Sequence, residues 1–414
     1  MPSTPVAVIV LASEPALTAL TISGPGRELA VFPPRFPMLD ARVDRIIATE
    51  VIVTARPGYV DSPAFGDSIF DKTSKWIVEV HTEAGATGIG ETYRGCGGDS
   101  VRWAAEQLLG RPLRSLPWHS PLPVDLRGND TFGHPDPPVP NRMHEFAFPR
   151  GAAETAMRVA LADLWGQALG VPVHALLGEC CRRRVAVSWW FGRSDATHAA
   201  EQMQIGLDQG FTAVKFKAAA EDDVAGIVQA VKTVAGAEAL VIIDPNNRFY
   251  RLTEAQEIAR RLESHDQIVF EDPFPFIPDE WQLFRQRSSI PLALHAQSAQ
   301  ALVHGPTRPF DYVNLGGPDC LFTAELAWRH RLQCWFGSGL ELGILDAWIL
   351  HHAAVARACS LPNDVGHLIR EDDLIAQTLE VRDGALTVPD DPGLGVTLDP
   401  VALARYTVGR FEVA

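Results

Sequence analysis

The feature that most constrains the fold is a regular alternation of strand-like and helix-like segments from about Val185 to Ile369. Its spacing is that of parallel strands joined by crossover helices. Strands are predicted at 185–191, 213–217, 239–244, 268–271, 291–295, 312–315 and 334–336. Helices are predicted at 196–209, 222–234, 253–264, 279–287, 299–303, 322–331 and 341–359. Seven or eight such units predict an α/β fold, a (β/α) TIM-type barrel.

The chain is longer than one barrel requires. It has 414 residues, whereas a barrel of this kind takes about 250. We therefore predict an α+β capping domain formed by the N-terminal region and the C-terminal tail. The expected divisions are an extension at 1–39, the cap at 40–150, the barrel with a leading linker helix at 151–370, and a tail at 371–414 that packs on the cap.

Net charge and cysteine spacing indicate which binding partners and which cellular compartment to expect. The net charge is −15, which argues against nucleic acid or an anionic membrane as a partner. The six cysteines form no CxxC pair, which is typical of reduced thiols in a cytoplasm. Because no basic residue precedes Arg27 and no long apolar run occurs, we expect neither a secretory signal nor a membrane span.

Two acidic residues end consecutive predicted strands, Asp244 in the string IDPN and Glu271 in the string FEDP. The carboxyl ends of parallel strands meet at one rim of a barrel, so these carboxylates should converge. Oxygen ligands from neighbouring strands suit Mg²⁺. Strand-end acids can instead cap the helices that follow them.

Lys215 and Lys217 alternate on the preceding strand, in the string VKFK. Residues two apart on a strand point to the same face, so both ammonium groups can enter the barrel mouth. We expect mutual repulsion and burial to lower their pKa values toward neutrality, as a base at pH 7 requires. The alternative is a solvated strand end.

The ordered strings resemble the mandelate racemase and muconate-lactonizing group of the enolase superfamily. The further strings that carry the resemblance are GIGET at 88–92, LWGQALGVPV at 164–173, DYVNL at 311–315, GSGLELGI at 337–344 and PGLGV at 392–396. The resemblance implies that Lys217 is the acid/base and that Lys215 helps to neutralise a bound carboxylate. It also implies that Asp244 and Glu271 are metal ligands, and that a base removes the proton α to a carboxylate to give a stabilised enediolate.

The resemblance further suggests which residues contact the substrate. Asn246, Tyr59 and Ser338 lie in strings that contact substrate in this group, Tyr59 within a Gly- and Pro-rich loop at 55–75. We expect a small-molecule carboxylate substrate and a homo-oligomer.

The chain departs from the family at the third metal ligand, on the fifth strand. The string PLALHAQ places Ala296 where an acid is usual. His295 is the predicted ligand, although Gln297 can also coordinate, or the ligand is absent. A His ligand would favour Mn²⁺, Fe²⁺ or Zn²⁺ over Mg²⁺. A substrate-contacting or buried, hydrogen-bonded histidine is the alternative.

The opposite face of the barrel also departs from the family. The usual sixth- and seventh-strand bases align with Gly316 and Gly337. Glu341 is then the candidate proton donor or substrate partner, or it caps the next helix. Asp311, which begins its strand, is read as structural.

One base without an evident second base favours a one-face reaction. We predict a metal-dependent dehydratase of acid-sugar-like or other hydroxy-acid substrates. The alternatives are a racemase or epimerase, for which Glu341, or less favourably Asp311, would serve as the second base, and a cycloisomerase. A further alternative is a non-catalytic, ligand-binding barrel that lacks the usual third metal ligand.

Overall fold

The chain divides into two units, residues 1–37 and 38–414. In the first unit, strands β1 (Leu20–Gly24) and β2 (Arg27–Val31) pair antiparallel, so the predicted extension contains a pair of strands. The barrel, the cap and the candidate site belong to the second unit. This computed structural model describes residues 20–24, 27–31, 36–56, 74–116, 118–119, 149–296, 302, 308–316 and 320–414.

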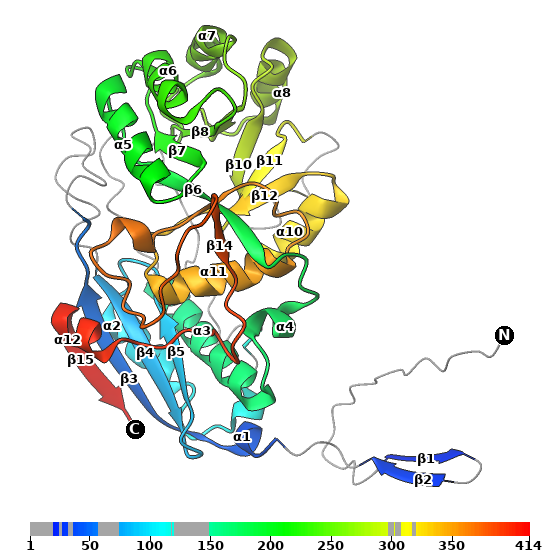
Figure 1. Ribbon diagram of the computed structural model, residues 1–414. Coiled ribbons are helices and arrows are strands. Elements are labelled where there is room, and N and C mark those ends of the chain that lie inside the picture. Colours follow the sequence, from blue (N-terminus) through cyan, green and yellow to red (C-terminus); the bar gives the residue numbers. More distant parts are fainter. Residues whose placement is uncertain are drawn as a thin grey trace. The chain divides into compact units, whose positions relative to one another are not determined.

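Eight parallel strands of the second unit form a nearly closed barrel, as predicted (Figure 1). The predicted strands agree with the observed ones to within one residue, and β13 is the strand that the sequence did not reveal. β13 pairs with β6, and Phe336 N at the end of β12 donates to Asn363 Oδ1 of β13 at 2.8 Å. The strands are β6 (Arg184–Phe191), β7 (Ala213–Lys217), β8 (Leu240–Asp244), β9 (Ile268–Glu271), β10 (Leu292–Ala296), β11 (Tyr312–Leu315), β12 (Gln333–Phe336) and β13 (Asn363–Asp364).

Helices follow the strands and cover the outside of the barrel. Those described in full are α5 (Ala196–Asp208), α6 (Val224–Ala235), α7 (Leu252–Leu262), α8 (Pro278–Arg287), α10 (Cys320–Arg329) and α11 (Gly343–Val355). The buried residues of α7 recur at helical spacing, so one stripe of the helix packs inward. The predicted helix at 341–359 is too long, because the backbone is extended at Leu342 and again at Ala356. The predicted helix at 299–303 lies outside the described residues except for Leu302.

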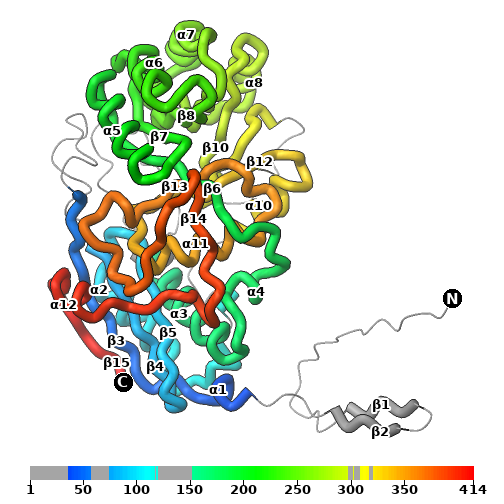
Figure 2. The backbone as a smooth tube through the Cα atoms, viewed as in Figure 1, coloured from blue at the N-terminus to red at the C-terminus, as the bar shows by residue number. Residues whose placement is uncertain are grey.

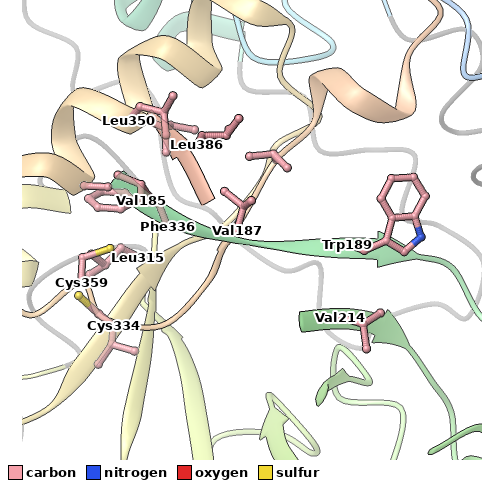
Figure 3. Close-up of a cluster of buried hydrophobic side chains, with 14 of the residues drawn as sticks. Val185, Val187, Trp189, Val214, Leu315, Cys334, Phe336, Leu350, Cys359 and Leu386 are labelled. Carbon is pink, nitrogen blue, oxygen red and sulfur yellow. The ribbon is translucent and has the colours of Figure 1, made fainter. Parts of the chain in front are cut away.

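Alternation along the strands gives the barrel two differently packed faces. Val214 and Phe216 of β7 belong to the outer core between strands and helices. Figure 3 shows part of this outer core, where side chains of β6 lie beside those of β12, α11 and β14 (Ala385–Thr387). A separate inner cluster comprises Ile242, Val269, Ala293 and Trp335. Because successive side chains alternate, Lys215 and Lys217 share the inner face.

The capping domain is built on a four-stranded antiparallel sheet in the order β15-β3-β4-β5. The C-terminal strand β15 pairs with β3, and Figure 2 shows the red tail returning beside the blue strand. The tail contains a seven-residue helix and a seven-residue strand. The strands are β3 (Val43–Ile52), β4 (Ser74–Thr82), β5 (Thr87–Glu91) and β15 (Thr407–Val413). The helices described outside the ring of barrel helices are α1 (Pro37–Asp40), α2 (Gly98–Glu106), the linker helix α3 (Pro149–Leu169), α4 (Val173–Leu177) and α12 (Pro400–Tyr406), with 3₁₀ turns at Leu113–Ser115 and His367–Ile369.

Two glycines of β5 allow the linker helix α3 to lie directly on the cap sheet. A Cβ atom at Gly88 would lie 2.2 Å from the carbonyl oxygen of Ala160, and one at Gly90 would lie 2.0 Å from that of Ala156. Any larger residue at either position would therefore push the helix away. In the described parts of the chain, no helix has the length and apolar character to cross a membrane.

Candidate active site

The two lysines and two carboxylates predicted from the sequence meet at one end of the barrel. Lys217 and Asp244 are register partners on β7 and β8, and Lys217 Nζ donates a hydrogen bond to Asp244 Oδ2. Lys215 Nζ lies 2.7 Å from Glu271 Oε2 and 3.3 Å from Asp244 Oδ2. All four side chains are buried. The roles assigned to them remain predictions.

A third carboxylate, which the sequence reasoning missed, completes this cluster. Asp364 ends β13, and its Oδ2 accepts a hydrogen bond from Lys215 Nζ at 2.8 Å. Its Oδ1 accepts from the hydroxyl of Ser188 on β6 at 3.3 Å. The available signal was topological, because a closed barrel requires an eighth strand after Phe336, and the first acidic residue after helix α11 is Asp364.

Asn314 occupies the opposite side of the same mouth. Its Nδ2 donates to Glu271 Oε1 at 2.6 Å. A Cβ atom at Gly337, on the neighbouring strand, would lie 2.4 Å from Asn314 Oδ1. The seventh-strand position at which the family resemblance would place a base therefore has no room here for any side chain while Asn314 keeps this position.

Strand register decides which fifth-strand residue faces the mouth. Ala293 of β10 pairs with Glu271 and belongs to the inner cluster, so His295, two residues later, also faces inward. Ala296 belongs to the outer core. His295 lies close enough to Asp244 to help lower the pKa of that carboxyl. Gln297 lies outside the described residues, and metal ligation by His295 remains a prediction.

The backbone at the strand ends adopts unusual conformations that position polar groups. Asn246 and Asp272 both have positive φ, at 48° and 42°, which is uncommon for residues other than glycine. Asn246 N donates to Asp244 Oδ1 at 3.1 Å, and Asp272 Oδ1 accepts from His295 N at 3.0 Å. Within the described residues, Asn246 Oδ1 is buried and has no hydrogen-bond partner, and the contact of Asn246 with a substrate remains a prediction.

Burial and mutual charge set the protonation of the cluster. Burial and the charge of Asp244 raise the pKa of Glu271 to about 8. Burial disfavours the charged form of Asp244, but Lys217 and Lys215 hold its pKa well below the usual range. The expected lowering is wrong for Lys215: burial alone would lower its pKa, but Asp364, Glu271 and Asp244 outweigh burial and raise it well above the ordinary value.

The carboxylate pair fits a hard divalent cation. Asp244 Oδ2 and Glu271 Oε2 both lie near one cationic atom, Lys215 Nζ, so the two acids are already arranged around a positive charge. Carboxylate oxygens are the donors that Mg²⁺ prefers, and Mg²⁺ often keeps waters or substrate oxygens as its other ligands. Among the residues that the structure describes, no three His, Cys, Asp or Glu side chains form a ready metal centre. Metal ligation by Asp244 and Glu271 remains a prediction.

Glu341 belongs to a different group, at the junction of barrel and cap. It precedes α11, and it accepts hydrogen bonds from Ser338 Oγ at 2.5 Å and from Gly339 N. Burial and the charge of Asp346 raise the pKa of Glu341 to about 7, although Lys75 of the cap opposes this. No hydrogen bond or ion pair found within the described ranges joins Glu341 to Lys215 or Lys217. The catalytic role of Glu341 and the substrate contact of Ser338 remain predictions.

Glu91, a residue that the sequence reasoning left without a role, joins the cap to the barrel. Its carboxylate forms an ion pair with Lys75 of β4. It also accepts from Leu342 N at 2.7 Å and from Leu345 N at 3.0 Å, so it caps the first turn of α11. We call Lys75, Glu91, Ser338 and Glu341 the junction cluster. Tyr59 lies outside the described residues.

Asp311, which was read as structural from the sequence, has structural contacts, and so do His351 and His352 of α11. His351 Nε2 bonds to Leu394 O at 3.0 Å and His352 Nδ1 to Trp348 O at 2.9 Å. Burial lowers the pKa of His351 to about 4 and that of His352 to about 3. Asp311 forms an ion pair with Arg285 and accepts from Leu292 N at 3.1 Å.

Comparison with known proteins identifies the family. The family model described as "Enolase C-terminal domain-like" matches residues 198–302 and 310–402. Muconate cycloisomerase 1 of Rhodococcus opacus is 26% identical over 382 residues, which cover 86% of this chain and 98% of that protein. The chain belongs to the mandelate racemase and muconate-lactonizing group of the enolase superfamily. The crystal structure of 2-chloromuconate cycloisomerase from Rhodococcus opacus, at 22% identity, matches 89% of this chain and 99% of that one with a TM-score of 0.69.

Other similar proteins are named for different reactions. N-succinylamino acid racemase of Thermus thermophilus is 29% identical and covers 66% of this chain and 77% of that protein. Probable glucarate dehydratase of Streptomyces coelicolor is 28% identical, and the match covers 80% of this chain and 84% of that protein. The protein is therefore an enzyme of the isomerase and lyase kind, and enzymes of this superfamily generally use a divalent metal, typically Mg²⁺. This finding contradicts the alternative of a non-catalytic barrel.

Proposed function

We propose that the protein removes the proton α to a substrate carboxylate with Lys217 and completes a β-elimination on the same face, as a dehydratase of an acid-sugar-like or other hydroxy acid. A divalent cation held by Asp244 and Glu271 would supply positive charge beside the carboxylate of the substrate. The observation that carries the proposal is that Lys217 donates a hydrogen bond to Asp244 on one face, whereas on the opposite face Asn314 fills the space that a side chain at residue 337 would need to act as a second base.

Each residue has a defined task in this reaction. Lys217 Nζ in its neutral form takes the α-proton, and the electron pair of the C–H bond passes into an enediolate. Lys215 stabilises the negative charge that develops on the carboxylate oxygens. The bond from the β-carbon to its hydroxyl oxygen then breaks. The ammonium of Lys217 returns the proton to this leaving group, so that water departs from the face on which the proton was taken.

A cycloisomerase is the second candidate. Syn cycloisomerisation also needs one face only, and the cycloisomerase from Rhodococcus opacus is matched over 98% of its length. A racemase would need a second base, and Glu341 is held in the junction cluster by Ser338 and Gly339. A homo-oligomer and a cytoplasmic location also remain proposals.

The direct test is a screen for α-proton exchange in D₂O. Purified protein with Mg²⁺ would be incubated with acid sugars, muconates and N-acylamino acids, and followed by ¹H NMR. We expect loss of the α-proton signal together with formation of a 2-keto-3-deoxy product from a hydroxy acid. Formation of a lactone from a muconate would contradict the dehydratase proposal and support the cycloisomerase. Inversion of an N-acylamino acid would refute the one-face reaction.

A further inference from the structure

Lys215 lies at the centre of three carboxylates that reach it from different strands. In the barrel order, β7 is flanked by β8 on one side and by β6 on the other, with β9 beyond β8 and β13 beyond β6. Asp244 and Glu271 therefore approach Lys215 from one direction around the barrel, and Asp364 from the other. The ammonium group also lies 5.8 Å from the centroid of the Trp335 ring.

The three contacts of Lys215 differ in kind. Only the contact with Asp364, among the three, has hydrogen-bond geometry, at 2.8 Å. Glu271 Oε2 is within ion-pair distance at 2.7 Å, but its angles do not make a hydrogen bond. The contact with Asp244 is longer, at 3.3 Å, and Asp244 Oδ2 accepts its hydrogen bond from Lys217. The directional bond of Lys215 is thus to the carboxylate on the far side from the predicted metal ligands.

Asp364 is itself held firmly in place. It is 2% exposed, and its register partner Ser188 on β6 donates to its second oxygen. This contact lies where β13 joins β6, so the position of Asp364 follows from the closure of the barrel. The proposed reaction assigns it no task.

We propose that Asp364 is a positioning residue that retains Lys215 when a divalent cation takes Asp244 and Glu271. The ammonium and a metal ion repel each other, and they compete for the same two carboxylates. With Asp364 present, Lys215 keeps a charged partner and leaves the other two to the cation. Without it, those two are the carboxylate partners that remain to Lys215 among the residues that the structure describes. The inference rests on the proposed function only for the location of the metal.

The test is a double-mutant cycle on the dissociation constant of Mn²⁺ alone, measured by calorimetry without substrate. We expect Asp364→Asn to raise the Kd of Mn²⁺ by ~10–100-fold, the usual range for residues that support metal ligands. In a Lys215→Met background, where no ammonium competes, we expect the same substitution to change the Kd by less than about 3-fold. Equal losses in both backgrounds would mean that Asp364 attracts the cation only by its charge, and would overturn the proposal, as would an unchanged Kd in Asp364→Asn.

Further variants separate this inference from the metal site. Ser188→Ala keeps the charge of Asp364 but removes the bond that orients it, and we expect a smaller rise in the Kd. Asp364→Glu should recover part of the affinity, and thermal melts check that each variant is folded. If Asp244→Asn binds Mn²⁺ as tightly as the wild type, the metal lies elsewhere and both proposals fail. If Asp244→Asn abolishes binding while Asp364→Asn does not alter it, only the role of Asp364 fails.

Discussion

Asn314 and Gly337 form a fitted pair across β11 and β12, in which the amide oxygen of Asn314 lies where a side chain at residue 337 would begin. The two residues face the interior of the barrel beside Glu271. This close fit means that the amide of Asn314 occupies the space that a basic side chain at residue 337 would need.

This fit predicts that one added methyl group at residue 337 lowers the stability of the protein, and that a smaller residue at position 314 restores it. We expect Gly337→Ala to lower the free energy of unfolding by ~1–3 kcal/mol, the usual effect of overpacking, as measured by urea denaturation. A second substitution, Asn314→Ala, should recover much of this loss. Gly97→Ala is the matched control, because a Cβ there meets nothing within 4 Å. Equal effects at 337 and 97 would contradict the steric account.

Glu91 should matter more for stability than its place in a short cap strand suggests. We expect Glu91→Ala to cost ~3–5 kcal/mol, the usual loss when one partner of a buried ion pair is removed. Lys75 would be left buried without its partner, and two N–H groups of α11 would lose their acceptor. Exposed Glu106 on α2 is the control, and Glu106→Ala should change the value by less than ~0.5 kcal/mol. Similar values for the two variants in urea denaturation would refute the capping role.

Glu341 should make stability depend on pH. Its pKa is raised to about 7 in the folded protein, so the folded state binds more protons than the unfolded state between the ordinary Glu value and pH 7. Stability contributed by this group is therefore present at low pH and falls as the pH rises through about 7. We expect Glu341→Gln to gain stability relative to the wild type from pH 5 to pH 8, by a few kcal/mol at most. A difference that is constant with pH would contradict this.

Metal binding should depend on Asp244 and Glu271, and its ion preference should show whether His295 is a ligand. We expect Mg²⁺ to raise the melting temperature of the wild type, since saturation at ~100 Kd adds ~2.7 kcal/mol. The double variant Asp244→Asn with Glu271→Gln should show no such rise. If His295 is a ligand, His295→Ala should lower the affinity for Zn²⁺ more than that for Mg²⁺, because imidazole suits the softer ion. Equal affinities in variant and wild type would exclude His295.

The sequence predicted those parts of the site that follow from strand periodicity. The string VKFK places both lysines on one face, and one strand–helix unit separates Asp244 from Glu271, so convergence followed from barrel topology alone. β13 was not predicted, because a strand of two residues, Asn363 and Asp364, has no periodicity to detect. The predicted lowering of the Lys215 pKa was wrong for the same reason. Lys215 donates its hydrogen bond to Asp364, which lies on the strand that was not predicted.

Contacts between distant parts of the chain were equally hidden. Glu91 caps a helix that begins at Gly343, and nothing near Glu91 in the sequence indicates this. Asn314 reads as one polar residue in a strand until its neighbour Gly337 is placed beside it. Such roles depend on which strands are adjacent, so they need coordinates.

The role of Lys217 is tested most directly by α-proton exchange, measured in D₂O by ¹H NMR on a substrate that the wild type turns over. We expect Lys217→Ala and Lys217→Arg to lower the exchange rate by at least ~10²–10⁴-fold, the usual contribution of a general base. Lys217→Arg keeps a cation beside Asp244 but cannot accept the proton, because arginine stays protonated. Metal affinity and melting temperature check that the site and the fold are intact. Near-normal exchange in either variant would contradict the account and place the base elsewhere, with Glu341 the next residue to test.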